Sequence, residues 1–95
     1  MKTKTIFRTF RKGGETIALF PEIPHDRHGY LCTSYQHIGQ HSGASPDLST
    51  VTRPATPEEI APLAAELARV GYDLAPVLRV TRAMHRARRL NAGIV

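Results

Sequence analysis

The chain has 95 residues, a length that fits one domain with a modest hydrophobic core and excludes two. Its net charge is +5, its single cysteine cannot form an intrachain disulfide, and no apolar run approaches the length of a membrane span. The first eight residues are too interrupted by charge to be a secretory signal. We therefore expect a soluble cytoplasmic protein without membrane contact, and so small a core favours binding over an elaborate catalytic site.

The charges are segregated along the chain. Residues 1–12 carry five cations and no acid, and residues 79–95 carry five arginines and no acid. Between them, residues 13–78 carry eight acids and three arginines. This pattern predicts an acidic body with two basic ends, and an anionic partner would bind at the ends.

The first twenty residues predict a β-hairpin. Residues 3–11 are rich in Thr, Ile and Phe, which suit a half-buried strand, and residues 15–20 are apolar on both faces. Lys12-Gly13-Gly14 between them is typical of a turn.

The next segments predict a loop, a strand and a second loop. Prolines and polar residues mark 21–29 as a loop, and residues 30–35 resume a β-like alternation as a third strand. Residues 36–46 are polar with two glycines and cannot bury a face, so we expect a surface loop there.

A helix is predicted over residues 57–71. Thr56 is placed as the N-cap, Pro57 as the first helical residue, and Glu59 to close a capping box. Pro62 lacks the N–H that would bond the Glu58 carbonyl, so we expect a distorted first turn or a later start. Apolar residues follow at helical spacing, and a glycine ends the run: Ile60, Leu63, Ala64, Leu67, Val70 and Gly71.

Residues 72–80 predict a last strand, which Pro76 confines to an edge or a bulge. Residues 82–95 are a basic tail that is either disordered or helical. The helix could form only when the tail is bound to a partner. In a helix, one face would carry arginines and the other small and apolar residues: Arg82, Arg86 and Arg89 against Ala83, Ala87 and Leu90.

The order β-β-β-α-β indicates an α+β fold, a small antiparallel sheet with one helix packed on one face. Residues 1–81 form the single domain, and residues 82–95 the basic C-terminal tail. One helix covers roughly half of a four-stranded sheet, so we expect the second face to stay open to solvent, to a partner or to a second copy in a homodimer.

Histidines cluster with the cysteine. Four of the five histidines and Cys32 fall within seventeen residues: His25, His28, His37 and His41. Such side chains can ligate zinc, but the H-x₂-H and H-x₃-H pairs match no familiar zinc module, and solvated histidines are ordinary in loops. We assign no metal ligand and no cofactor, and keep a small histidine-based metal site as an alternative.

Catalytic signatures are absent from the sequence. No phosphate-binding glycine loop, H-E-x-x-H motif or carboxylate pair at catalytic spacing occurs. Cys32 has no acid or amide placed to orient a histidine base, and a cysteine in mid-strand is usually a small buried hydrophobe. The sequence therefore predicts a non-enzymatic protein.

Two sets of residues are candidates for binding. The first is a hydrogen-bonding segment that suits polar recognition of a partner, or else satisfies the backbone of a long loop: Tyr35, Gln36, His37, Gln40 and His41. The second comprises cations of the two ends, which suit phosphate contacts with nucleic acid, or else merely solubilise disordered termini: Arg79, Arg82, Arg86, Arg89, Lys2 and Lys4.

Four segments in this order resemble a family of short uncharacterised proteins carried by bacterial plasmids, integrative elements and phages: Ile6–Arg8, Glu15–Pro21, Ser34–His41 and Pro54–Glu59. The resemblance spans residues 3–75 and carries over no catalytic or ligand residue. The resemblance implies that the protein is encoded alongside small accessory proteins that bind and block host defence, such as anti-CRISPR and anti-restriction inhibitors.

The principal hypothesis from the sequence is thus a binding module. It would engage a host protein or a protein–nucleic acid complex through the open sheet face and the segment from Tyr35 to His41. The alternative is an accessory protein that binds nucleic acid through its basic ends.

Overall fold

The computed structural model describes residues 2–36, 40–46, 48 and 50–93, with Gln40 through its backbone alone. It confirms the α+β class and the small, mainly antiparallel sheet. The described elements, in chain order, are β1 (Thr3–Phe10), β2 (Thr16–Pro24), β3 (Cys32–Gln36), β4 (Gln40–Ala44), β5 (Thr52–Pro54), α1 (Pro57–Val70), β6 (Leu74–Pro76) and α2 (Arg82–Asn91).

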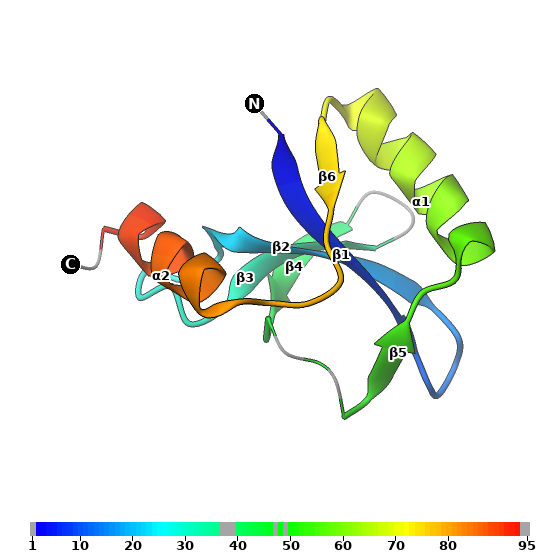
Figure 1. Cartoon of the computed structure of the whole chain (residues 1–95), viewed down its shortest axis with the longest axis horizontal. Helices are drawn as coiled ribbons and strands as arrows, with labels where there is room; N and C mark the ends of the chain where they lie inside the picture. The colour runs from blue at the N-terminus through cyan, green and yellow to red at the C-terminus, as the bar shows by residue number, and fades with distance from the viewer. Residues whose placement is uncertain (1, 37–39, 47, 49, 94–95) are drawn as a thin grey trace.

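The β1–β2 hairpin is the centre of the sheet (Figure 1). The strand order is β4-β3-β2-β1-β5, and Ile6 lies opposite Leu19 in the antiparallel central pair. The outer edge of β1 pairs with two short strands. Its C-terminal half pairs antiparallel with β5, and its N-terminal half pairs parallel with β6. That parallel pair is the one departure from the expected antiparallel sheet among the described strands.

The first face of the sheet packs against α1. Phe7, Phe20 and Tyr35 from three neighbouring strands meet Leu63 and Leu67 of the helix in one buried cluster. Alternate residues of a strand point to opposite faces, so β1 and β2 each bury side chains on both.

Helix α1 begins where the capping signal predicts. The Glu59 N–H donates to Thr56 Oγ1 at 3.2 Å, and the Thr56 N–H donates to Glu59 Oε1 at 2.9 Å. The helix starts at Pro57 and runs through the exposed Pro62, so the delayed start is not observed. The intact cap and the burial of Leu63 and Leu67 on the sheet hold the turns around Pro62 in place.

The expectation of an open second face is wrong. The chain between β6 and α2 crosses this face, where Val77 and Val80 pack against a second buried cluster of Ile6, Ile17, Leu19 and Cys32. In Figure 1 this connection passes over the strands on its way to α2. This sheet face is therefore not open to a partner or to a second copy of the chain as a bare surface.

The segment predicted as a C-terminal tail is helical over α2, one of the two expected states, and α2 packs on the folded body. Met84 and Arg88 are buried, and the Asn91 side chain donates to the Glu22 carbonyl at 2.9 Å. The sequence suggested that Ala83 and Leu90 lie on the apolar face of this helix, yet both are exposed. Helix α2 packs on β2 through another face, which includes Met84 and Arg88. The two helices lie at opposite ends of the long axis of the molecule (Figure 1).

Several strands differ from the sequence prediction. β2 runs through Pro24, so the loop predicted over residues 21–29 is wrong in its first four residues, and the β2–β3 register shifts between Phe20 and Pro24. β3 begins at Cys32 and not at residue 30. Residues 40–44 form β4 where a surface loop was expected, β5 was not predicted, and β6 is shorter than the expected strand over 72–80. Each is held mainly by backbone pairing at a sheet edge, which needs no apolar alternation. Neither described helix is long and apolar enough to cross a membrane.

Candidate nucleic-acid interface

A buried arginine fixes α2 on the sheet. Arg88 is 4% exposed; its Nε–H donates to the Gly29 carbonyl at 2.7 Å and its Nη1–H to the Pro21 carbonyl at 2.9 Å. Its Nη2 lies 2.9 Å from His85 Nδ1. One guanidinium thus connects the helix to β2 and to the loop before β3. These bonds fix which face of α2 is turned toward solvent.

The outward face of α2 is an arginine stripe, which we define as Arg82, Arg86 and Arg89. All three are exposed, and their i, i+4, i+7 spacing places them on one side of the helix. The stripe is about 10 Å long at 1.5 Å per residue. Helix α2 contains no acidic residue, so no carboxylate within it neutralises the stripe.

The loop over residues 25–31 lies beside α2 and presents an exposed aromatic ring. Tyr30 is 62% exposed, and the Arg89 guanidinium carbon lies 5.4 Å from the centre of its ring. Asp26 folds the loop on itself, since its Oδ1 accepts the Leu31 N–H at 2.9 Å. This hydrogen bond holds the pKa of Asp26 below its ordinary value. The sequence did not single out Tyr30, because nothing in its neighbourhood shows that α2 docks there.

Four of the eight acidic residues lie on α1 or directly after it, at the other end of the molecule from α2. Glu58, Glu59 and Glu66 lie on α1, and Asp73 follows it. Both Nη–H groups of Arg53 donate to the Glu59 carboxylate, at 2.8 and 2.7 Å. These bonds and the Thr56 N–H lower the pKa of Glu59 to about 2. These four acidic residues thus lie away from the arginines of α2.

The other predicted nucleic-acid contacts do not join the arginine stripe. Lys2 Nζ lies 3.5 Å from an Asp73 oxygen, and Lys4 Nζ donates to Glu22 Oε2 at 3.2 Å. Each of the two lysines is thus close to a carboxylate that partly neutralises its charge. Arg79 is exposed in the connection before α2 and lines a hollow on the second sheet face.

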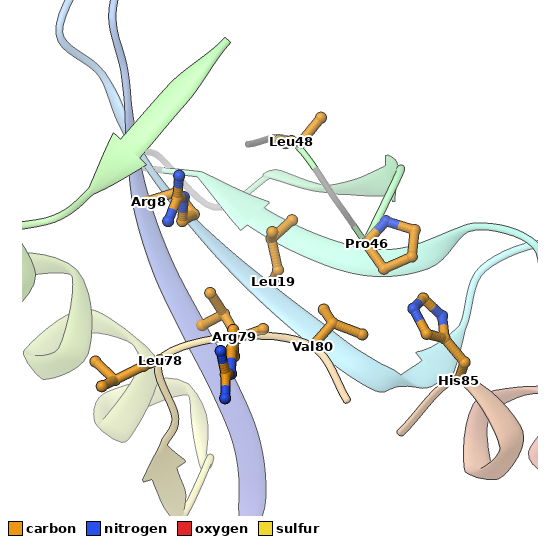
Figure 2. Close-up of a pocket in the computed structure, with 9 residues that line it drawn as sticks. Arg8, Leu19, Pro46, Leu48, Leu78, Arg79, Val80 and His85 are labelled. Atoms are coloured by element: carbon orange, nitrogen blue, oxygen red, sulfur yellow. The ribbon is translucent and has the colours of Figure 1, made fainter. Parts of the chain in front are cut away.

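That hollow has a cavity volume of about 250 Å³ and an apolar floor that includes Leu19 (Figure 2). Arg8 and His85 lie at its two ends, while Arg79 stands beside Val80 on the near side. Arg8 is fixed there, because its Nε–H donates to Thr52 Oγ1 and its Nη2–H to the Thr52 carbonyl, both at 3.0 Å. The hollow is lined by cations at its margin and does not extend the arginine stripe.

The segment predicted to bind a partner is largely engaged within the fold. Tyr35 is 2% exposed and belongs to the core under α1, so its ring has no surface to offer. His41 Nε2 lies 3.0 Å from the Tyr72 hydroxyl, and the His41 ring meets the Tyr35 ring edge-on. Gln36 reaches Glu15 at 3.4 Å. His37 and the Gln40 side chain lie outside the described residues.

Histidines from the predicted cluster are dispersed. His25 packs against Gly43, His28 lies near Tyr30, and His41 contacts Tyr72. Within the described ranges, no three His, Cys, Asp or Glu side chains converge as metal ligands, and His37 is outside those ranges. Burial raises the pKa of the Cys32 thiol to about 11, which leaves it protonated at neutral pH and unsuited to nucleophilic attack.

A scan against protein-family models and searches of curated proteins and of solved structures found no match to this chain. The resemblance to mobile-element proteins therefore stays a prediction.

Proposed function

We propose that this protein is a non-enzymatic nucleic-acid-binding protein that contacts phosphates through the arginine stripe of α2. The observation that carries the proposal is that Arg82, Arg86 and Arg89 are exposed together on a helix without acidic residues. Arginine neutralises phosphate and releases condensed counterions, which favours binding without reading sequence.

The anchoring of α2 supports this assignment. Arg88 satisfies the Gly29 and Pro21 carbonyls inside the fold and leaves the other three arginines directed away from the sheet. A helix held in this way presents its cations without first paying the entropy of ordering a free tail.

The experiment is a titration of a labelled 20-nucleotide DNA, single-stranded and duplex, followed by fluorescence anisotropy at several salt concentrations. Three neutralised phosphates predict a slope of log affinity against log salt between about −2 and −3. Replacing all three arginines of the stripe with glutamine should weaken binding at least roughly tenfold at low salt and flatten the slope.

The matched control removes the same charge elsewhere. Arg11, Lys12 and Arg69 are exposed and lie on the hairpin tip and on α1, away from α2. Their triple glutamine variant should keep most of the affinity. Equal losses in the two variants would show that net charge alone drives binding, and the proposed interface would be wrong.

The broader hypothesis from the sequence is a host protein as partner, in the manner of an inhibitor of host defence. It rests on the resemblance and stays a prediction. In the described part of the chain, Gln36 and His41 are the residues of the original segment that remain near the surface.

A further inference from the structure

An exposed aromatic ring is held beside the arginine stripe. Tyr30 is 62% exposed although a tyrosine ring is usually packed, and it contacts two further groups suited to nucleic acid. Arg89 lies over the ring at 5.4 Å, and the His28 ring lies 5.8 Å from it at a tilt of 36°. We call Tyr30, Arg89 and His28 the ring platform.

The backbone on both sides of Tyr30 is fixed. Gly29 has φ of 72°, a conformation that favours glycine, and a Cβ there would lie 3.1 Å from the Arg89 Cα. Helix α2 thus packs directly on the Gly29 backbone, while the Leu31 N–H is bound to Asp26. The Tyr30 side chain projects between two tethered residues, so its exposure is built into the fold.

The charges around the platform favour an anionic ligand. The loop over 25–31 and α2 together carry exposed arginines and one acidic residue, Asp26, which is engaged by the backbone. The exposed arginines are Arg27, Arg82, Arg86 and Arg89. The platform therefore combines a π surface with a phosphate-binding surface.

This combination distinguishes unpaired from paired nucleic acid. In a duplex both faces of each base are already stacked on neighbouring base pairs, so an exposed tyrosine gains nothing from them. An unpaired base offers a free face, and stacking of such bases on aromatic rings is the common mode of single-strand binding. Phosphates flanking that base would then lie within reach of the arginine stripe.

We propose that the α2 end binds single-stranded nucleic acid with one unpaired base stacked on Tyr30 and the neighbouring phosphates on the arginine stripe. This inference rests on the proposed function and adds to it the class of substrate and the residue that selects it. Base stacking and phosphate binding are possible with DNA and with RNA, so single strands of both kinds are tested.

The experiment measures the affinity of labelled 12-nucleotide single strands, in DNA and in RNA, and of the same DNA as a blunt duplex. Tyr30→Ala should weaken single-strand binding about tenfold, within the range that loss of one stacking contact gives, and leave duplex binding within about twofold. Tyr30→Phe keeps the ring and should bind like the wild type. Leu31→Ala is the matched control, since this neighbouring side chain is 39% exposed and has no π face.

A second readout reports stacking directly. Single strands carrying 2-aminopurine should lose fluorescence on binding to the wild type and to Tyr30→Phe, and should keep it on binding to Tyr30→Ala. Circular dichroism of each variant establishes that the fold is retained, which is expected because the Tyr30 side chain is outside the core.

The outcomes separate the two proposals. If the arginine variant loses binding while Tyr30→Ala matches the wild type on single strands, base stacking is refuted and the nucleic-acid function stands. Equal affinity of the wild type for single strands and duplex would also refute it. If the wild type binds none of these nucleic acids, both proposals fall.

Discussion

Arg88 shows how the position of one residue decides its role. Arg82, Arg86 and Arg89 are exposed, whereas Arg88 on the same helix is buried and satisfies two backbone carbonyls. By residue type the four are alike. Helical spacing in the sequence grouped Arg82, Arg86 and Arg89 on one face and left Arg88 out, but it did not show that Arg88 is buried. The separation follows from packing, since the helix turns one of its four arginines toward the sheet.

We predict that Arg88→Ala lowers the free energy of unfolding by about 3 kcal/mol, because the Gly29 and Pro21 carbonyls lose their charged donor in a buried place. Urea denaturation followed by circular dichroism measures the change. Arg88→Lys keeps the charge but cannot reproduce the fork geometry, so it should be intermediate. A loss below about 1 kcal/mol for the alanine variant would show that these bonds contribute little.

At the residue scale, Tyr35 was wrongly predicted to be a surface residue, and Tyr30 was not singled out. Tyr35 lies in a polar sequence that suggests a surface, yet its ring is buried with Phe20 under α1. Tyr30 begins an apparent strand, yet it stands exposed at the end of the loop. The packing of α1 on β3 decides the role of Tyr35, and the packing of α2 on the loop decides that of Tyr30. Both are tertiary properties.

Among the elements, α1 was predicted best because its signals are local. The Thr56 cap, Pro57 and Glu59 act within one turn, and the observed capping box has the expected partners. The short strands β4 and β5 were missed because edge pairing depends on backbone contacts with distant strands. For the same reason α2 could be recognised as amphipathic while its docking could not.

The acid sensitivity of the fold should be traceable to the α1 cap. The pKa of Glu59 is lowered from 4.5 to about 2, so this carboxylate stabilises the fold above pH 4.5 and its contribution is lost as the pH falls toward 2. Glu59→Gln should therefore flatten the decrease in melting temperature between pH 4.5 and pH 2.

Thermal unfolding at a series of pH values tests this, with Glu58→Gln as the control. Glu58 is an exposed carboxylate of the same turn and leaves the capping box intact. An unchanged acid profile in Glu59→Gln would mean that the Arg53 and Thr56 contacts do not survive in solution.

At the scale of the whole molecule, the sequence predicted the fold class and the segregation of charge but not the covering of the second face. The alternation in β2, with Ile17 and Leu19 opposite Ala18 and Phe20, indicates burial on both faces. The segment that buries the second face begins after β6 and looks in isolation like a linker. Its role depends on where α2 is anchored.

We predict that a chain ending at residue 81 loses stability as well as affinity. It would expose the site of Met84 and leave the carbonyls bound by Arg88 without partners, a cost of about 3 kcal/mol or more. Denaturant unfolding compares it with the arginine-stripe variant, which keeps the helix and should remain near wild-type stability. Wild-type stability of the truncated chain would support the prediction that residues 82–95 are a tail outside the domain.

The division of the β1 edge between β5 and β6 has a consequence for self-association. An unpaired strand edge is a template for strand addition by another chain, and β1 with eight residues is one of the two longest strands described. Both halves of its outer edge are occupied, so the free edges on that side belong to β5 and β6, which have three residues each. On the opposite side of the sheet the described edge strand is β4, whose five residues include a glycine and no large aliphatic side chain. The described edge strands are thus short, which limits strand addition by a neighbouring molecule.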